Sequence, residues 1–462
     1  MQIDALVFEI GSTTTVVNAF DYLNTPNPVF LGSGEAPTSV TEGDVNKGIL
    51  QALETLKRNL NTNELNALET FATSSAAGGL KMSVHGLVYD MTVKAAKEAA
   101  LGAGANIKMI TSGILDDFDI DQIKKSKLNI IMISGGVDYG ETQTALKNAE
   151  IIASLQLSIP IIYAGNIQNQ ERVKSLFHKF NQASYLFISE NVYPKIDVLK
   201  VTEARKIIQS VFEKHIIHAP GMEKVRETIS SEIMPTPGAV MRATELLQKE
   251  LGDVCTFDVG GATTDVHSVA SVSKEVEKIL ISPEPFAKRT VEGDLGVYVN
   301  KDNLIDLVTI PTLLKDLKIE RSTLDELIQK YQPIPDKCQI PLVKRLTEEA
   351  LKKALMRHVG RFIQLYGSSG RTTVAEGKDL TNVRHIIGTG GALSKIPGGK
   401  ELISKVVSEI DDSLLKPRKD SEVLIDNDYI MASCGVLSLK YQDSALKLLK
   451  DSLYKESTCI QD

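Results

Sequence analysis

The sequence predicts an α/β protein with one duplicated unit and one parallel α/β module. Two segments, residues 5–20 and 254–269, each read as a strand, a carboxylate, a glycine turn and a returning strand. Between residues 105 and 195, apolar strands alternate with helical stretches, which is typical of a parallel sheet covered by helices.

Length and composition set the broad class. A chain of 462 residues exceeds one hydrophobic core, so two to four domains are expected. The net charge is -7 and no Lys/Arg block stands out, which argues against a nucleic-acid surface. We expect no signal peptide, because the N-terminus enters a strand pattern with no charged n-region or apolar h-region. We expect no membrane span, because no apolar run approaches about 18 residues. The scattered cysteines favour the reducing cytoplasm over a disulfide or zinc framework: Cys255, Cys338, Cys434 and Cys459.

The first duplicated unit opens the chain. Ala5 to Phe8 predicts a strand, Glu9 supplies the carboxylate, and Thr15 to Phe20 predicts the returning strand. The turn between the strands consists of Gly11, Ser12, Thr13 and Thr14.

The second unit has the same order. Val254 to Val259 predicts a buried strand with Asp258 near its end, and Thr264 to Val269 predicts the return. The turn contains Gly260, Gly261 and Ala262. Its bare N–H groups could face a phosphate and its carboxylate could hold hydrated Mg²⁺, although this stretch alone fits a plain hairpin equally well. Two such units in one order favour a duplicated fold with two facing phosphate loops.

The module from 105 to 195 follows from the alternation of its segments. Strands are expected at 107–110, 129–133, 159–164 and 184–188, and helices at 141–155 and 171–180. Ligands of such sheets bind beyond the carboxyl ends of the strands, where Ser134 to Gly140, Gly165 and Asn166 lie. An ordinary loop role explains these residues equally well.

The remaining elements are mostly helical. Helices are predicted at 44–60, 92–104, 203–217, 239–251, 344–366, 400–410 and 429–439, with a short strand at 70–74. Ser74 to Gly79 is a small-residue turn, and Lys288 to Gly296 is read as a solvated loop. A third glycine turn follows a strand at 385–387 and includes Gly390, Gly391 and Ala392.

Several common motifs are missing from the sequence. There is no GxxxxGK[ST], no GxGxxG after a strand, no HExxH, no GxSxG and no kinase signature set. The order of glycine turns and helices instead resembles the actin, sugar-kinase and heat-shock-chaperone ATPase superfamily. The resemblance lies in two phosphate loops, two connecting helices and an adenosine loop: Phe8 to Thr14, Met234 to Met241, Asp258 to Asp265, Gly388 to Pro397 and Asp428 to Gly435.

The sequences of five segments resemble corresponding segments of the MutL/GlmL family, which is unrelated to mismatch-repair MutL. These segments are Ser74 to Gly79, Asp258 to Ser268, Lys288 to Gly296, Gly377 to Leu380 and Gly388 to Ala392. The resemblance covers essentially the whole chain. It implies a cytoplasmic, ATP-driven reactivating chaperone of an adenosylcobalamin-dependent aminomutase, with ornithine aminomutase or glutamate mutase as the partner. A dimer is one expected assembly.

The same resemblance implies an organisation and a site. We expect a two-lobed actin-like ATPase with ribonuclease H-like lobes, divided into a first lobe (1–104), an inserted Rossmann-like module (105–200), a helical return (201–252) and a second lobe (253–462). ATP would lie on the three turns, with Mg²⁺ held by Glu9 and Asp258. Thr13 and Thr263 would orient the γ-phosphate, and Asp265 would position water.

Two differences from the family's sequence pattern and two alternative functions qualify this expectation. Glu9 replaces the superfamily's usual aspartate, so ATP turnover is expected to be altered or slow, and Gly135 to Gly140 differs from the loop expected of glutamate-mutase partners. A small-molecule kinase of the same fold is one rival, although sugar-kinase motifs are missing. A non-enzymatic, nucleotide-binding assembly protein is the other.

Overall fold

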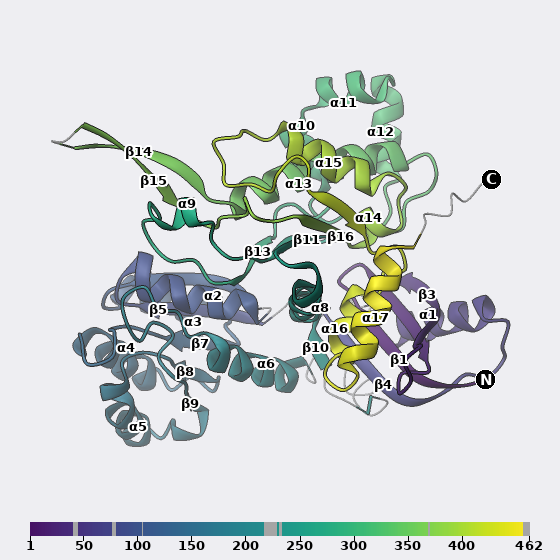
Figure 1. Cartoon of the computed structure of the whole chain (residues 1–462). Coiled ribbons are helices and arrows are strands. Elements are labelled where there is room, and N and C mark those ends of the chain that lie inside the picture. Colours follow the sequence, from purple (N-terminus) through teal and green to yellow (C-terminus); the bar gives the residue numbers. More distant parts are fainter. Residues whose placement is uncertain are drawn as a thin grey trace. The chain divides into compact units, whose positions relative to one another are not determined.

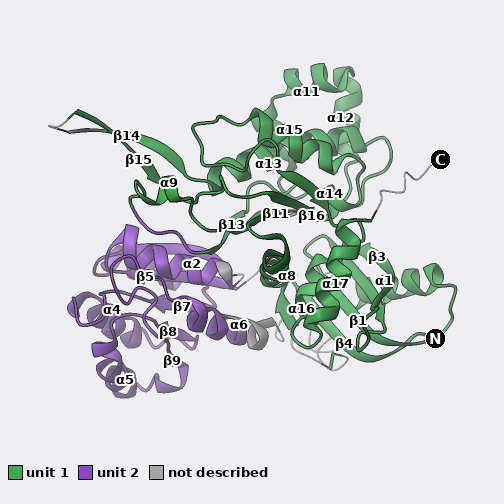
Figure 2. Cartoon of the chain, viewed as in Figure 1, with its two compact units in different colours: residues 1–76, 220–281, 286–462 green, residues 77–219, 282–285 purple. Residues whose placement is uncertain are grey.

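The structure is a computed structural model, and it describes residues 1–39, 45–75, 80–103, 105–216, 229–230, 233–367 and 370–455. The chain forms two compact units (Figure 2). Unit 1 comprises residues 1–76, 220–281 and 286–462, and unit 2 comprises residues 77–219 and 282–285. Unit 2 therefore extends beyond both ends of the expected module at 105–200. Residues 76–79 of the predicted small-residue turn lie outside the described part of the chain.

Unit 1 contains two five-stranded sheets with the same strand order and directions. The first sheet consists of β1 (Gln2–Ile10), β2 (Thr14–Asp21), β3 (Val29–Pro37), β4 (Asn66–Ser74) and β10 (Ile233–Pro235) in the order β10-β4-β1-β2-β3. β2 runs antiparallel to both β1 and β3, whereas β4 runs parallel to β1 and β10. Helix α1 (Asn46–Asn59) belongs to this part of the chain.

The second sheet repeats this topology in the order β17-β16-β11-β12-β13. Its strands are β11 (Val254–Val259), β12 (Thr264–Val269), β13 (Ala287–Glu292), β16 (His385–Thr389) and β17 (Glu422–Ile425). β12 is antiparallel to β11 and β13, and β16 is parallel to β11 and β17. The predicted duplication and α/β class are confirmed, and both sheets have the ribonuclease H-like arrangement.

Two helices pack in a hydrophobic cluster that both sheets share. Helix α8 (Thr236–Leu251) and helix α16 (Met431–Leu437) lie next to each other (Figure 1). Both bury side chains in one cluster with Val7 of the first sheet and Ile387 of the second. Helix α17 (Gln442–Leu453) joins the same cluster. A second core lies under the second sheet, where α13 (Ile340–His358) and α15 (Gly399–Glu409) cover it.

Two sequence predictions in unit 1 need correction. The predicted helix at 344–366 ends at His358, and residues 361–367 form strand β14 (Arg361–Gly367), which pairs with β15 (Gly370–Glu376). The helix ends because Val359 is already extended (φ -80°, ψ 155°), and Gly360 then lets β15 approach, since a Cβ there would lie 2.4 Å from the Glu376 carbonyl oxygen. The loop predicted at 288–296 is wrong for its first half, because β13 reaches Glu292 and buries Arg289. Residues 311–343, expected to form a connector or small helices, contain α11 (Ile310–Leu317) and α12 (Arg321–Gln329).

Shorter elements complete unit 1. These are α9 (Lys274–Glu277), α10 (Lys301–Val308) and α14 (Gly391–Ser394).

Unit 2 contains one parallel sheet in the order β6-β5-β7-β8-β9. Its strands are β5 (Lys81–Gly86), β6 (Asn106–Ser112), β7 (Ile130–Ile133), β8 (Ile161–Tyr163) and β9 (Leu186–Ile188), and every pairing is parallel. The predicted parallel α/β arrangement is confirmed. Its helices are η2 (Tyr89–Val93), α2 (Lys94–Gly102), α3 (Asp117–Lys125), α4 (Gln143–Ser154), η3 (Ile167–Asn169), α5 (Gln170–Lys179), η4 (Ala183–Tyr185) and α6 (Thr202–Ile216).

Strand β5 was not anticipated from the sequence. Its residues, KMSVHG, form no apolar run, yet the strand is buried between β6 and β7. The side chains of His85 and Ser83 form a hydrogen bond there, with the Ser83 hydroxyl and His85 Nε2 2.8 Å apart. Among the described residues, no helix is both long and apolar enough to cross a membrane.

Candidate functional site

The first glycine turn joins β1 to β2 and is held by its carbonyl groups. The Gly11 amide donates to the Thr14 carbonyl (2.9 Å), which closes the turn. Thr38 donates from its amide to the Thr13 carbonyl (2.9 Å) and from its hydroxyl to the Gly11 carbonyl (2.9 Å). Within the described ranges, the amides of Ser12 and Thr13 donate to no protein group. The turn therefore offers free N–H donors while its carbonyls are occupied.

The second turn joins β11 to β12 and has the same construction. Gly260 donates to the Thr263 carbonyl (3.0 Å), as Gly11 does to Thr14. Val299 donates to the Gly261 carbonyl (2.8 Å), and the Asn300 side chain donates to the Ala262 carbonyl (2.9 Å). In the described part of the chain, the Gly261 and Ala262 amides have no protein acceptor. Free amides in a tight turn form an anion-binding concavity.

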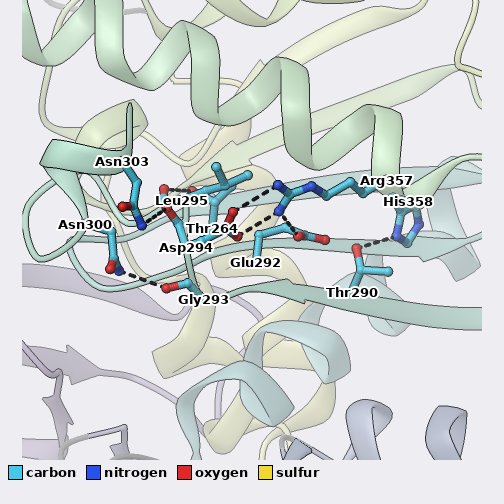
Figure 3. Close-up of polar contacts among 10 residues, drawn as sticks. All are labelled: Thr264, Thr290, Glu292, Gly293, Asp294, Leu295, Asn300, Asn303, Arg357 and His358. Atoms are coloured by element: carbon cyan, nitrogen blue, oxygen red, sulfur yellow. Dashed lines mark hydrogen bonds and ion pairs between the residues drawn. The ribbon is translucent and has the colours of Figure 1, made fainter. Parts of the chain in front are cut away.

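Arg357 forms ion pairs with Glu292 and Asp294, and these pairs are called the arginine clamp. Figure 3 shows Arg357 of α13 reaching Asp294 with both terminal nitrogens, at 2.7 and 2.9 Å, and Glu292 at 2.6 Å. The same segment receives a bond from Asn300 to the Gly293 carbonyl (2.8 Å). Bidentate arginine–carboxylate pairs fix geometry as well as charge. The clamp thus fixes the segment on which the turn rests, and sequence reasoning had read this segment only as a solvated loop.

The two turns lie against each other. A Cβ built on Gly261 would stand 2.7 Å from the Thr13 hydroxyl oxygen and 2.9 Å from its methyl carbon. The Thr13 side chain occupies the space that a side chain at Gly261 would need, so the contact requires glycine. Turns that are 250 residues apart in the chain are therefore in contact.

The third glycine turn packs on the second. Gly390 follows β16 with φ of +88°, and a Cβ there would stand 2.4 Å from the Val259 carbonyl oxygen. A left-handed backbone and this close approach both require glycine. Gly391 and Ala392 begin the short helix α14, and a Cβ on Gly391 would meet nothing within 4 Å.

Four carboxylates gather beside the turns: Glu9, Asp265 and Asp426 are buried, and Asp258 is half-buried. Burial, then the nearby charge of Asp265, raises the pKa of Asp258 to about 7, and the charges of Glu9 and Asp426 add to this rise. Such shifts indicate that the carboxylates repel one another in a poorly solvated region. A divalent cation would relieve this repulsion, and oxygen donors suit Mg²⁺. The free amides of the turns and the carboxylate oxygens together fit a bound phosphate with its metal.

Glu9 connects the first turn to helix α16. Its Oε1 accepts bonds from the Ser433 amide (2.9 Å), the Ser433 hydroxyl (2.5 Å) and the Asn18 side-chain amide (3.2 Å). Burial raises the pKa of Glu9 to about 7, against the lowering effect of the Ser433 hydrogen bond. Glu9 therefore ties β1 to the helix that is shared by the two sheets.

Asp426 holds the start of the same helix. It accepts bonds from the Met431 amide (2.8 Å), the Ile430 amide (3.1 Å) and the Thr389 hydroxyl (2.9 Å). Sequence reasoning missed Asp426, although a carboxylate before a helix start is a familiar capping signal.

Asp265 lies opposite Asp258 in the β11–β12 ladder and pairs with a buried arginine. The Arg289 guanidinium lies 3.1 Å from Asp265 Oδ2, and both side chains are buried. Sequence reasoning placed Arg289 in a solvated loop and so missed this partner. Thr263 closes the turn with its carbonyl, and Thr14 begins β2.

The loop after β7 lies in unit 2 and is held by its own neighbours. Asn166 accepts from the Tyr139 amide (3.2 Å), while Asp138 accepts from the Ile167 amide (3.0 Å) and the Asn191 side chain (2.9 Å). Gly136 requires glycine, because its φ is +72° and a Cβ would stand 2.0 Å from the Glu141 carbonyl oxygen.

Comparisons with known proteins give one strong similarity of sequence. The model of a family described as MutL protein matches residues 5–453. The chain is 36% identical over 468 residues to "Protein MutL" of Clostridium tetanomorphum, covering 97% of this chain and 99% of that one.

Solved structures are less similar. A nucleotide-free acetone carboxylase chain has a TM-score of 0.41 at 13% identity, covering 94% of this chain and 70% of that one. A diol dehydratase-reactivating factor in nucleotide-free form has a TM-score of 0.38 at 11% identity, covering 95% and 99%. A glycerol dehydratase reactivase has a TM-score of 0.34 at 11% identity, covering 94% and 99%.

Proposed function

This chain belongs to the MutL protein family, as its sequence predicts, and we propose that it is an ATP-dependent reactivating protein of an adenosylcobalamin-dependent aminomutase. The observation that carries the proposal is the pair of facing turns whose amides are free, with carboxylates beside them. The proposed task is release of damaged cobalamin from the mutase in the cytoplasm, so that intact cofactor can bind. Ornithine aminomutase and glutamate mutase are the proposed clients.

The proposed nucleotide site uses the residues of all three turns. Amides of Ser12, Thr13, Gly261 and Ala262 donate to the phosphates, and hydroxyls of Thr13 and Thr263 orient the terminal phosphate. Gly390, Gly391 and Ala392 pack beside the adenosine. The folded chain holds such donors in position before the reaction, so they stabilise the negative charge that develops during it without having to reorganise.

The carboxylates complete the proposed site. Glu9 and Asp258 hold the hydration shell of Mg²⁺ from opposite turns, and Asp265 positions water near the terminal phosphate. When bound, Mg²⁺ neutralises charge on the phosphates of ATP. Glu9 already accepts three bonds through Oε1, so its part in the site is linked to the position of Ser433.

Coupling to the client is proposed to pass through α8 and α16. These helices cross where a Cβ on Gly435 would stand 2.0 Å from the Ala239 carbonyl oxygen. We propose that the two sheets belong to two ATPase lobes and that nucleotide, bound by turns from both sheets, favours one arrangement of them. To shift a client almost completely from one conformation to the other, ATP binding must change the preference of this chain for the two client conformations by about 5.5 kcal/mol.

Unit 2 is the proposed client-binding module. Its sheet leaves large apolar side chains exposed after the carboxyl ends of its strands, where ligands of parallel sheets bind. These side chains are Val88, Tyr89, Ile114, Phe118, Tyr139, Ile167, Ile196 and Val198. Exposed apolar groups that form one patch are typical of a protein-interaction surface, and we propose that these side chains form one.

The proposed ATP hydrolysis is tested by replacing Asp258. We expect Asp258→Ala to abolish phosphate release from ATP and Mg²⁺, because one of the two carboxylates that hold the metal's hydration shell is lost. Asp302→Asn removes an exposed carboxylate of α10 and serves as the matched control, with unchanged turnover. Normal turnover of Asp258→Ala would show that this carboxylate does not serve the metal.

A further inference from the structure

One face of the second sheet carries a buried histidine without partners. His267 of β12 is 0% exposed, and neither ring nitrogen has a hydrogen-bond partner in the described structure. An unsatisfied buried polar group costs about 1–3 kcal/mol. By contrast, buried His358 is bonded at both nitrogens, to Thr290 (2.9 Å) and Ser268 (2.8 Å). His267 is therefore placed at an energetic cost that its own surroundings do not offset.

Two carboxylates share the face of His267. Asp265 stands two residues earlier on the same strand, so its side chain points to the same side of the sheet. Asp258 pairs directly opposite Asp265 in the β11–β12 ladder. One ligand atom from each of the three side chains lies within 4.8 Å of the others.

The spacing is close to that of a metal centre. In a tetrahedral centre with bonds of about 2.1 Å, two ligand atoms lie about 3.4 Å apart, so side-chain rotations must bring the three ligand atoms closer by up to about 1.4 Å. Asp265 Oδ1 also has no partner in the described structure, while its Oδ2 accepts from Arg289 at 3.1 Å. Two of the three clustered side chains, His267 and Asp265, thus carry atoms without a hydrogen-bond partner in the described structure.

The chemistry of the donors selects the class of ion. His267 is buried and neither ring nitrogen has a hydrogen-bond partner in the described structure, so a nitrogen lone pair of the neutral imidazole is available to an ion. Carboxylates alone suit Mg²⁺ or Ca²⁺, whereas an added imidazole nitrogen favours Mn²⁺, Fe²⁺, Co²⁺ or Zn²⁺.

The first sheet has no equivalent cluster. By strand register, Val16 pairs with Glu9 as Asp265 pairs with Asp258, and Asn18 pairs with Val7 as His267 pairs with Thr256. The Asn18 amide nitrogen donates to Glu9 (3.2 Å) and Ser433 (2.9 Å). The first copy thus has the carboxylate of Glu9 but no counterpart of Asp265 or His267 at the paired positions.

We propose that Asp258, Asp265 and His267 form a binding site for a divalent transition-metal ion. Three protein ligands leave coordination positions open for water or an anion. The site needs no nucleotide, so this inference does not depend on the proposed ATPase activity, although Asp258 serves both.

The test is Mn²⁺ binding to the full chain without nucleotide, after removal of metals with a chelator. We expect a single tightly bound Mn²⁺ in an electron paramagnetic resonance titration, with ¹⁴N coupling from one imidazole in the spin-echo spectrum. A large excess of Mg²⁺ should be needed to displace it. His267→Gln should weaken Mn²⁺ binding at least about tenfold. The control, His385→Gln, changes a partly exposed histidine of β16 in the same sheet and should leave binding unchanged.

Three results would overturn the inference: no bound Mn²⁺, bound Mn²⁺ without nitrogen coupling, or unchanged affinity in folded His267→Gln. The nitrogen coupling is measured on the unaltered chain, so it decides the matter even if the variant does not fold. Normal ATP binding without Mn²⁺ binding contradicts this inference alone. Mn²⁺ binding without ATP binding contradicts the proposed function alone.

Discussion

At the scale of single residues, buried histidines differ in how the chain satisfies them. His85 of β5 is completely buried, and its ring nitrogens lie 2.8 Å from the hydroxyls of Ser83 and Thr111. Burial lowers the pKa of His85 to about 3, so the folded chain keeps this imidazole neutral. The unfolded chain takes up a proton near pH 6.5, and stability therefore depends on pH.

Replacing His85 should remove part of this dependence. Below pH 6.5 the unfolded state binds more protons than the folded state at this position, so stability falls as pH falls toward 3. At pH 5 the loss is about 2 kcal/mol relative to pH 7.5. We expect His85→Gln to lose less stability than the unaltered chain between these pH values, as measured by urea unfolding.

The matched control for this experiment is His178→Gln, which changes an exposed histidine of α5. It should show the pH dependence of the unaltered chain. An identical pH dependence in His85→Gln would contradict the account of a neutral buried imidazole.

The residues of the candidate site differ in how far the sequence could predict them. Glu9 and Asp258 are local signals, because each directly precedes a glycine turn. Ser433 donates a hydrogen bond to Glu9 although the two residues are 424 positions apart in the sequence, and no local sequence pattern predicts such a contact. Arg289 was misread because a strand at the edge of a sheet can carry as many charges as a loop.

At the scale of elements, the crossing of α8 and α16 depends on a missing side chain. A Cβ at Gly435 would meet the carbonyl oxygen of Ala239 at 2.0 Å, and its neighbours there are backbone atoms that cannot rotate away. The small residues of this helix were recognisable in the sequence as a sign of close helix approach.

Gly435→Ala should therefore destabilise the chain. Alanine favours a helix over glycine by about 1 kcal/mol, but overpacking a tight contact costs about 1–3 kcal/mol. We expect a lower free energy of unfolding in thermal or urea unfolding. We also expect a smaller conformational change of unit 1 when ATP binds.

Gly293→Ala provides the comparison, because a Cβ there meets nothing within 4 Å. Equal or greater stability of Gly435→Ala would mean that the helices can separate without cost.

Element boundaries were predictable where apolar periodicity was strong. The strands β11 and β12 fall where the sequence placed them. The helix expected to continue to residue 366 was wrong because Phe362 and Ile363 extend its apolar period by chance, whereas the chain is already extended at Val359 and continues into β14. β5 was missed because its polar residues are satisfied by neighbouring strands rather than by solvent.

At the scale of the whole molecule, the duplicated sheets and the family could be predicted from the order of the turns. The two sheets share one topology, which explains why their turns have the same hydrogen-bond pattern. The extent of unit 2 was not predictable in detail, because β5 and residues 282–285 join it from outside the regular alternation.

Unit 2 should bind the client through its exposed apolar side chains. Phe118 is 69% exposed and Tyr139 is 78% exposed, each beyond the carboxyl end of a strand. We expect the double variant Phe118→Ser and Tyr139→Ser to lose co-purification with the cobalamin-dependent mutase and to keep ATP turnover, because both residues lie outside unit 1.

Leu50→Ser changes an equally prominent apolar residue of α1 in unit 1 and should leave mutase binding intact. Full mutase binding by the double variant would assign the client surface to another part of the chain.

The account as a whole depends on one nucleotide being held by two facing turns. Equilibrium binding of ATP with Mg²⁺ to Gly261→Val tests this most directly, because the new side chain would need the space that the Thr13 side chain occupies, without requiring an unusual backbone. Gly293→Val, in open space, is the control. We predict that Gly261→Val, folded by circular dichroism, binds ATP at least about tenfold more weakly, a loss of about 1.4 kcal/mol or more, while Gly293→Val binds normally. Unchanged ATP affinity in Gly261→Val would contradict the central claim.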